Sequence, residues 1–386
     1  MNAAKIAYDT RVMGPKNTTY SRSGPDALVL HLLQSMVSAG RSGDLITAQQ
    51  KMHDMLAGIR RYQTCGVPPV VRDHAVIWQR GPVRLLHVKA PERNRDKPPV
   101  ILIPSLVNGW EILDLLPKQS FARYLQQKGF DVHIIDWGDL REEPDIQTLP
   151  QLLFDILAPM VRMVSATAGL RVITMGYCMG GLLMAGAVPE MRAHLAAQVY
   201  LATPWDFHTG DPYLTRLVRA AAPQMLSVLQ GTGYWPNTQV QMLFASVDPD
   251  MAIQKFARFY GLAPDDPAYA HFVAVEDWLQ TGRDLPRDIA LVCLRDWYLQ
   301  NKTGQGSWQV GVHPVTASTL SEVPSLVVAP ARDRLVETQT ARALADAMGR
   351  RTKLLTPDIG HIGMMASARA AELVWDPVVS WLAKKI

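Results

Sequence analysis

The sequence predicts an α/β fold with a mostly parallel sheet flanked by helices, and two observations support this prediction. Between residues 100 and 201, short apolar segments of strand length alternate with segments of helical spacing. A cysteine also stands in a glycine-rich turn between one such strand and the helix that follows it. Strands that alternate with helices form parallel sheets whose two faces are covered. With 386 residues, 48% of them hydrophobic, the chain is long enough for one large core with an inserted cap.

The predicted elements follow one another in a regular order. Apolar residues at helical spacing in residues 27–59 predict a pair of helices outside the sheet, and residues 83–88 read as an entering strand. The expected strands are 100–103, 132–135, 172–175, 198–201, 325–330 and 353–356, with helices at 121–128, 152–166 and directly after the cysteine. We therefore expect an N-terminal helical segment (1–82), a first core part (83–205), a largely helical cap (206–320) and a second core part (321–386).

The glycine-rich turn has the sequence Gly-Tyr-Cys-Met-Gly-Gly at residues 176–181, with Cys178 at its centre. A nucleophile between two glycines, after a buried strand and before a helix, is typical of the α/β-hydrolase fold, here with Cys in place of Ser. The glycines let strand and helix approach each other around a strained residue. A cysteine in such a pattern can also be buried for packing alone, so its partners decide the interpretation.

Two further residues complete a candidate triad with Cys178. Asp333 comes just after the strand at 325–330, and His361 lies in the loop after the strand at 353–356. The order nucleophile, acid, histidine is the order of this fold, and loops after parallel strands converge at one edge of the sheet. His361 would take the thiol proton while Asp333 fixes its tautomer. Asp358 is a rival acid, although its Pro-Asp-x-Gly context is typical of a turn.

An oxyanion hole is expected beside the candidate nucleophile. The backbone N–H of Met179, the residue after Cys178, would supply one donor. The second donor would come from the loop after the strand at 100–103, at Leu106 or Val107.

Composition excludes several other kinds of site. The net charge is +4, with 39 Lys and Arg against 35 Asp and Glu in scattered positions, which does not support nucleic-acid binding. The three cysteines form no Cys-x-x-Cys pair and no metal-ligand spacing with the histidines, so no metal and no cofactor are expected.

The N-terminus lacks the apolar stretch of a signal peptide, and no run of about 18 apolar residues predicts a transmembrane segment. We expect a cytoplasmic protein.

Eight motifs, in shared order and spacing, carry a resemblance to a known family. They are Ser-Leu-Val-Asn (105–108), Leu-Asp-Leu (113–115), Val-His-Ile-Ile-Asp-Trp-Gly (132–138), the cysteine turn (176–181), Ala-Thr-Pro-Trp-Asp-Phe (202–207), Asp-Trp-Tyr-Leu-Gln-Asn-Lys (296–302), Asp-Arg-Leu-Val (333–336) and Gly-His-Ile-Gly (360–363). From about residue 83 onward the chain resembles the polyhydroxyalkanoate synthases, above all the short class III catalytic subunit that works with a second protein.

The resemblance implies an acyltransferase that polymerises 3-hydroxyacyl-CoA with release of CoA. It implies that Cys178 carries the acyl chain as a thioester, that His361 activates the thiol and the incoming hydroxyl, and that Asp333 assists that hydroxyl. It further implies a polyester granule, a second synthase subunit or a homodimer as partners, and a place at the granule surface.

Two alternatives stay open on the sequence. One is a cysteine hydrolase of the same fold, either a thioesterase or an intracellular polyhydroxyalkanoate depolymerase. The other is a non-catalytic granule-associated subunit. The double glycine after Met179 and the Ser-Leu-Val-Asn run favour the synthase, and the presence of all three triad residues argues against the non-catalytic subunit.

Overall fold

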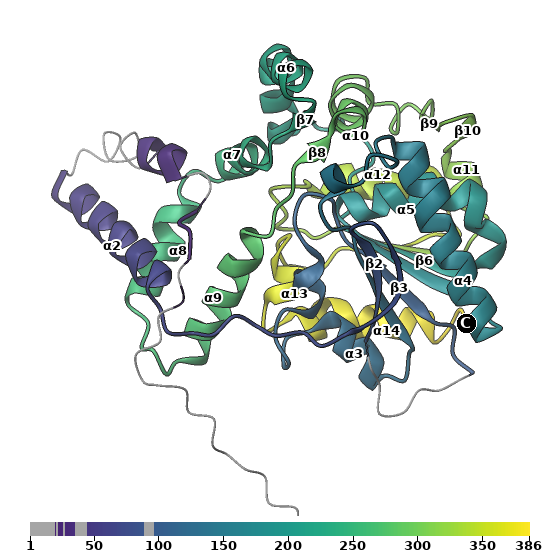
Figure 1. Cartoon of the computed structure of the whole chain (residues 1–386), viewed down its shortest axis with the longest axis horizontal. Helices are drawn as coiled ribbons and strands as arrows, with labels where there is room; N and C mark the ends of the chain where they lie inside the picture. The colour runs from purple at the N-terminus through teal and green to yellow at the C-terminus, as the bar shows by residue number, and fades with distance from the viewer. Residues whose placement is uncertain (1–19, 21, 26–27, 35–44, 89–95) are drawn as a thin grey trace, which may run out of the picture.

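Figure 1 shows the computed structural model of the chain, which describes residues 20, 22–25, 28–34, 45–88 and 96–386. Its body is an 8-stranded sheet in the order β1-β2-β4-β3-β5-β6-β11-β12. The strands are β1 (Ala75–Arg80), β2 (Val83–Val88), β3 (Val100–Ile103), β4 (Val132–Asp136), β5 (Val172–Tyr177), β6 (Leu195–Leu201), β11 (Ser325–Val328) and β12 (Lys353–Leu355). Six neighbouring strands are parallel to one another, namely β4, β3, β5, β6, β11 and β12. Beyond β4 the sheet continues with β2 and then β1, each in antiparallel pairing. This is the strand order of the α/β-hydrolase fold, which confirms the fold predicted from the sequence.

The register of the parallel strands brings their carboxyl ends to one edge. Ile103 of β3 lies opposite Gly176 of β5, and Val328 of β11 lies between Leu201 of β6 and Leu355 of β12. Because parallel strands end on the same side of a sheet, the loops after β3, β5, β11 and β12 meet there. Cys178 and the loops that contain Asp333 and His361 follow three of these strands.

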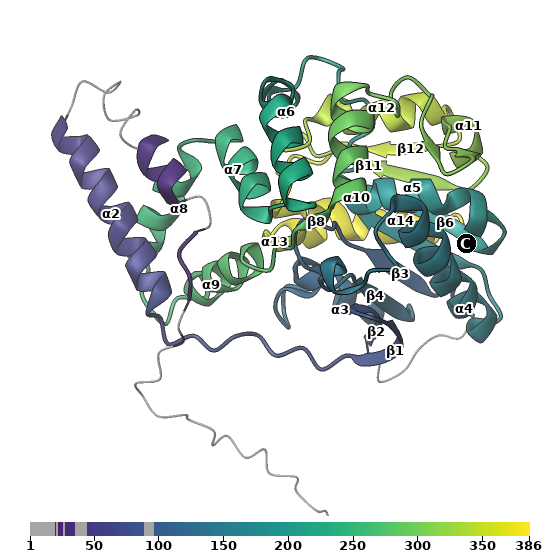
Figure 2. The same ribbon diagram turned by 45° about the horizontal axis from the view of Figure 1, so that its top comes forward.

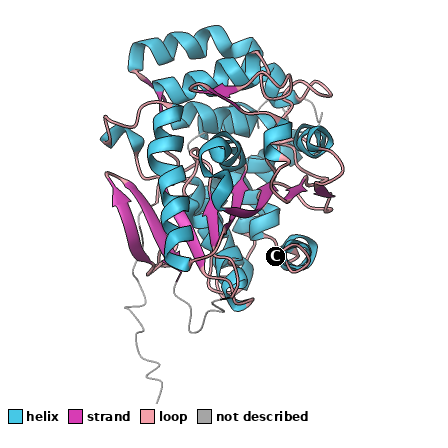
Figure 3. Ribbon diagram, turned by 90° about the vertical axis from the view of Figure 1, so that its right-hand side faces the viewer, coloured by secondary structure: helices cyan, strands magenta, loops and turns pink. Residues whose placement is uncertain are grey.

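Helices cover both faces of the sheet, as Figure 3 shows with the strands between two sets of helices. One core cluster joins the sheet to α4, α5 and α12, and a second joins the other face to α3, α13 and α14. The helices and short helical turns of the body are α3 (Phe121–Gln127), α4 (Ala158–Ala168), α5 (Met179–Met191), α12 (Thr338–Met348), α13 (Gly363–Ala366), α14 (Asp376–Leu382), η1 (Trp110–Asp114), η2 (Leu140–Glu142), η3 (Gln151–Leu157), η4 (Arg192–His194) and η6 (Ala371–Trp375). Every residue of β5 and β6 is buried, as expected for strands covered on both faces.

One helical stretch of the described chain, Gln151–Ala168, is long and apolar enough by length and composition to cross a membrane. It consists of the π-helical turn η3 followed by α4. Its apolar side chains, among them Leu152, Ile156 and Val161, are buried in the core cluster that also contains α5. Such burial is typical of a core helix.

The segment between β6 and β11 is mostly helical and projects beyond the sheet in Figures 1 and 2. Its elements are α6 (Tyr213–Thr232), α7 (Asn237–Val247), α8 (Met251–Tyr260), α9 (Pro267–Leu279), α10 (Arg287–Leu291), the π-helical η5 (Val292–Leu299), α11 (Ala317–Leu320), and the two-residue pairs β7 (Tyr234–Trp235) with β8 (Leu285–Pro286) and β9 (Gln309–Val310) with β10 (His313–Pro314). Trp297 and Trp308 belong to the same hydrophobic cluster as α5, so this segment shares the main core. The boundaries at residues 206 and 320 therefore stay a prediction.

The N-terminal helices lie outside the sheet, as the sequence predicted for the part that is described. Residues 28–34 are helical, and α2 (Leu45–Gln63) packs along α8, with Met55 and Tyr62 buried against Phe256 (Figure 2). Residue 27 and residues 35–44, which the predicted helix pair also included, lie outside the described residues.

Candidate active site

Cys178 occupies the turn between β5 and α5 in a strained backbone conformation. Its φ is 55° and its ψ is −125°, values that a residue with a side chain rarely adopts. Such a conformation costs about 1–3 kcal/mol and persists only where the surrounding structure imposes it. Here the Cys178 N–H donates a hydrogen bond to the carbonyl of Leu201 at 2.8 Å, which ties the turn to the end of β6. The side chain is partly exposed, in a cavity described below.

Three glycines make this turn sterically possible. A Cβ on Gly180 would lie 2.1 Å from the carbonyl oxygen of Ile103, and one on Gly181 would lie 1.9 Å from Thr203 Oγ1. A Cβ on Gly176 would lie 2.4 Å from the Cα of Gly181. These separations are far below any normal contact, so the close approach of β5, α5 and β3 requires glycine at all three positions.

His361 and Asp333 form a buried pair next to Cys178. His361 Nδ1 lies 2.6 Å from Asp333 Oδ2, and the Asp333 side chain has no exposed surface. The other carboxylate oxygen, Oδ1, accepts hydrogen bonds from the N–H groups of Leu335 at 2.9 Å and Val336 at 2.8 Å. Both oxygens of Asp333 are thus held in place, and the carboxylate orients the imidazole.

The loops that carry this pair are joined to each other. The N–H of Ala331 donates to the carbonyl of Pro357 at 2.8 Å, and the N–H of Arg332 donates to that of Ile359 at 3.0 Å. Asp358, the rival acid of the sequence, is exposed and pairs with the Arg332 side chain instead. The structure therefore places Asp333, and not Asp358, against the histidine.

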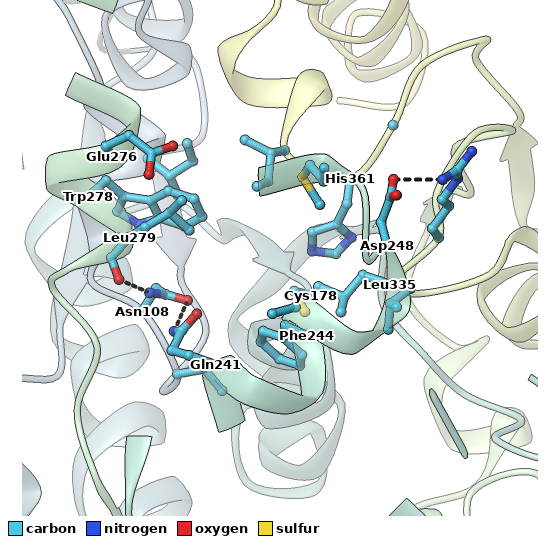
Figure 4. A pocket seen from close by; sticks show the side chains of 18 of the residues that line it. Asn108, Cys178, Gln241, Phe244, Asp248, Glu276, Trp278, Leu279, Leu335 and His361 are labelled. Atoms are coloured by element: carbon cyan, nitrogen blue, oxygen red, sulfur yellow. Dashed lines mark hydrogen bonds and ion pairs between the residues drawn. The ribbon is translucent and has the colours of Figure 1, made fainter. Parts of the chain in front are cut away.

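The imidazole of His361 faces the thiol of Cys178 across the site (Figure 4). Burial disfavours the imidazolium, but the charges of Asp333 and Cys178 and hydrogen bonds to both outweigh burial and raise the pKa of His361 well above its usual 6.5. The ring of Tyr177 packs against that of His361 with 5.2 Å between centroids, and its hydroxyl donates to the His361 carbonyl at 3.2 Å. The sequence did not single out Tyr177, because only the fold brings it to the histidine loop.

The three backbone donors predicted for an oxyanion hole are not equivalent. The N–H of Val107 donates to Ser105 Oγ at 3.0 Å and is already engaged. Among the described backbone hydrogen bonds, the N–H groups of Leu106 and Met179 have no acceptor. This geometry favours Leu106 over Val107 as the partner of Met179, and the oxyanion hole itself stays a prediction.

A cavity of about 420 Å³ opens above the thiol, with Cys178 and His361 in its lining. Its other walls come from α7, α8, α9 and the loop after β3, so segments far apart in sequence enclose it (Figure 4). Asn108 joins two of these walls, because its amide donates to the Leu279 carbonyl at 3.2 Å and its oxygen accepts from Gln241 at 3.3 Å. The cavity is large enough for a substrate much bigger than a single acyl unit.

One cluster of potential metal ligands occurs among the described residues, and it lies outside this cavity. His87, Asp131 and His133 place ligand atoms within 4.8 Å of one another near the start of β4, at the opposite edge of the sheet from Cys178. His87 Nε2 lies 2.7 Å from Asp131 Oδ1, and the two imidazoles stack with 5.1 Å between centroids. The sequence did not indicate this cluster, because the pairing of β2 with β4 joins residues more than forty positions apart.

Comparison with known proteins gives a consistent set of relatives. The chain is 27% identical over 316 residues to the poly(3-hydroxyalkanoate) polymerase subunit PhaC of Haloferax mediterranei, which covers 80% of this chain and 63% of that protein. It is 25% identical over 320 residues to the subunit of the same name from Synechocystis sp., covering 80% and 84% of the two chains. For the subunit from Allochromatium vinosum the identity is 25% over 291 residues, covering 74% and 80%. No protein-family model matches the chain.

Solved structures of similar shape include a lipase from Acinetobacter baumannii AYE, with a TM-score of 0.48, 12% identity and coverage of 81% of this chain and 93% of that one. The carboxylesterase CesB of Bacillus subtilis has a TM-score of 0.45, 13% identity and coverage of 86% and 100%. By sequence similarity over about four fifths of its length, this chain is a relative of the poly(3-hydroxyalkanoate) polymerase subunits, as its motifs predicted.

Proposed function

We propose that the chain is an acyltransferase of the polyhydroxyalkanoate synthase type, which polymerises 3-hydroxyacyl units delivered as CoA thioesters. The observation that carries the proposal is the position of Cys178, on a strained turn and facing the His361–Asp333 pair inside a cavity. The similarity to poly(3-hydroxyalkanoate) polymerase subunits selects this reaction among those that such a site can perform.

In the first step, the thiolate of Cys178 attacks the carbonyl carbon of the CoA thioester. A new carbon–sulfur bond forms to Cys178, the bond to the CoA sulfur breaks, and CoA takes a proton from the imidazolium of His361. The raised pKa of His361 supports this step, because it favours the imidazolium beside a thiolate. The N–H groups of Met179 and Leu106 would bind the oxyanion that forms on the carbonyl.

In the second step, the hydroxyl of another 3-hydroxyacyl unit attacks the thioester on Cys178. The neutral imidazole of His361 accepts the hydroxyl proton, a carbon–oxygen ester bond forms, and the carbon–sulfur bond to Cys178 breaks. Cys178 leaves as a thiolate next to the newly formed imidazolium, so the site returns to its starting state. Asp333 stabilises that imidazolium through the 2.6 Å contact to Nδ1.

Water would give hydrolysis in place of polymerisation, since it can attack the same thioester. Apolar side chains of the helical segment, including Phe244, Met251 and Leu279, line the cavity around the thiol. Such a lining disfavours water at the reaction centre and strengthens the electrostatic contacts there.

The test is to incubate the purified protein with 3-hydroxybutyryl-CoA and to follow free CoA and insoluble polyester together. We expect CoA and polymer in parallel, and neither with Cys178→Ala. CoA release with only free 3-hydroxybutyrate would identify a cysteine hydrolase, the alternative function. No CoA release and no acylated cysteine, also after addition of a candidate partner subunit, would overturn both and favour a non-catalytic subunit.

We also propose that the chain works with a second chain, as a second synthase subunit or a homodimer, in the cytoplasm at the surface of polyester granules. Two observations support a second chain. The relatives are named as subunits. The described N-terminal helices also expose the apolar side chains of Val29, Leu33 and Ile46, which another chain could cover. A fluorescent fusion should coincide with stained granules in cells that accumulate polyester. Diffuse fluorescence in such cells would contradict the granule location.

A further inference from the structure

A second, smaller cavity of about 70 Å³ also has Cys178 in its lining. The linings of the two cavities share Ser105, Val107, Cys178, Phe244 and Leu335, so Cys178 borders both spaces. An apolar cavity of about 150 Å³ holds a six-carbon ring, so in proportion a cavity of 70 Å³ has room for about three non-hydrogen atoms. This is most of the part of a short hydroxyacyl group that lies beyond its carbonyl.

The walls of the small cavity carry hydrogen-bond donors that lack acceptors. Trp235 and Trp297 line it, and the indole N–H of each is buried without an acceptor among the described residues. Tyr298 also lines it, and its hydroxyl makes no hydrogen bond within the part of the chain that the structure describes. Buried donors are almost always satisfied, so these donors are available to an acceptor oxygen that enters the cavity.

Tyr298 is held in a defined position. It belongs to the π-helical element η5, a type of distortion that occurs mostly at functional sites. Its carbonyl accepts a hydrogen bond from His208 Nε2 at 2.8 Å, and its ring meets that of Phe207 edge to face at 4.8 Å. Burial raises the pKa of the Tyr298 phenol, and the neighbouring Cys178 and Cys293 raise it further, so the hydroxyl stays protonated and can donate.

We infer that the small cavity binds the 3-hydroxyacyl unit while it is attached to Cys178, and that the Tyr298 hydroxyl donates a hydrogen bond to the oxygen on its third carbon. This inference rests on the proposed function and names a subsite and a positioning residue for it. The hydrogen bond would orient the acyl unit for attack at its carbonyl. It would also distinguish hydroxylated acyl groups from plain fatty acyl groups of equal length, which leave the phenol without a partner.

The experiment measures acylation of Cys178 in a single turnover, by CoA release and by the mass of the intact protein. It compares 3-hydroxybutyryl-CoA with butyryl-CoA, which has the same carbons and no hydroxyl. We expect the wild type to prefer 3-hydroxybutyryl-CoA by about tenfold or more. Tyr298→Phe should react more slowly with 3-hydroxybutyryl-CoA but not with butyryl-CoA, and should therefore lose most of this preference. Tyr124→Phe, on the opposite side of the sheet, is the matched control and should keep the preference.

Three results would overturn the inference. A wild type that reacts equally with both donors shows no selection for the third-carbon oxygen, whatever the variant does. A Tyr298→Phe protein that slows both donors equally, or neither, shows that the phenol does not contact that oxygen. A wild type that neither donor acylates overturns the proposed function as well, so the two failures are separable.

Discussion

Among single residues, His361 gives the site its dependence on pH. Its pKa is raised in the folded protein, because Asp333 and Cys178 favour the imidazolium more strongly than burial opposes it. A raised pKa means that the imidazolium stabilises the folded protein fully below about pH 6.5, the value in the unfolded chain. This contribution is lost as the pH rises through the pKa of the folded state. The same ion pair should keep Cys178 reactive at neutral pH.

The reaction of Cys178 with iodoacetamide tests this ion pair. At pH 7 the wild type should react about tenfold faster than His361→Gln, because the raised pKa of His361 favours an imidazolium beside the thiol. Cys65 and Cys293 are buried and should react slowly in both proteins. Equal rates for the two proteins at pH 7 would show that His361 does not activate the thiol.

The sequence predicted the three triad residues because each follows a strand, and parallel strands end at the same edge of the sheet. It could not choose between Leu106 and Val107, since that choice depends on the Ser105 hydroxyl, which accepts the Val107 N–H. The sequence also could not predict the small cavity or the position of Tyr298 in it, because side chains from six separate segments form that space. Rotamers and packing of this kind leave no periodic signal in a sequence.

Among the elements, the turn between β5 and α5 is the most constrained sterically. Gly180→Ala would place a methyl group 2.1 Å from the Ile103 carbonyl oxygen, in backbone that cannot easily move. We expect the free energy of unfolding to fall by about 1–3 kcal/mol, measured by urea denaturation. Gly231→Ala, near the end of α6 with no atom within 4 Å of its Cβ, is the matched control and should stabilise by up to about 1 kcal/mol. Similar losses in both variants would contradict the steric account.

The sequence predicted the element types better than their ends. The strands at 83–88, 100–103 and 132–135 were confirmed to within one residue, because apolar runs between turn residues define them. β1 was missed although it contains the apolar run 75–78, and the structure shows this edge strand to be partly exposed. The helix predicted at 152–166 is a π-helical turn followed by α4, a change in hydrogen bonding that apolar spacing does not reveal.

In the molecule as a whole, the helical segment does more than cover the site. Asn237, at the start of α7, donates its side-chain amide to the carbonyl of Val107 at 2.8 Å and to that of Arg283 at 3.2 Å. The backbone N–H of Arg283 donates to the same Val107 carbonyl at 3.2 Å. The loop that contains the proposed oxyanion donor is therefore held by the helical segment.

Asn237→Ala should lower the rate of Cys178 acylation by about tenfold with little change in KM. A displaced oxyanion donor reduces the stabilisation of the transition state more than it reduces the binding of the substrate. Thr238→Ala removes a neighbouring exposed side chain on the same helix and should leave the rate unchanged. Steady-state CoA release at several substrate concentrations separates kcat from KM. A loss confined to KM would show that Asn237 acts on substrate binding alone.

The location of the acyl group on the protein tests the thioester at Cys178 most directly. After brief reaction with 3-hydroxybutyryl-CoA and acid quenching, peptide mass mapping should find one 3-hydroxybutyryl group, on the peptide that contains Cys178, in the wild type and none in Cys178→Ala. An acyl group on Cys65 or Cys293, or CoA release that persists in Cys178→Ala, would contradict a mechanism through a thioester at Cys178.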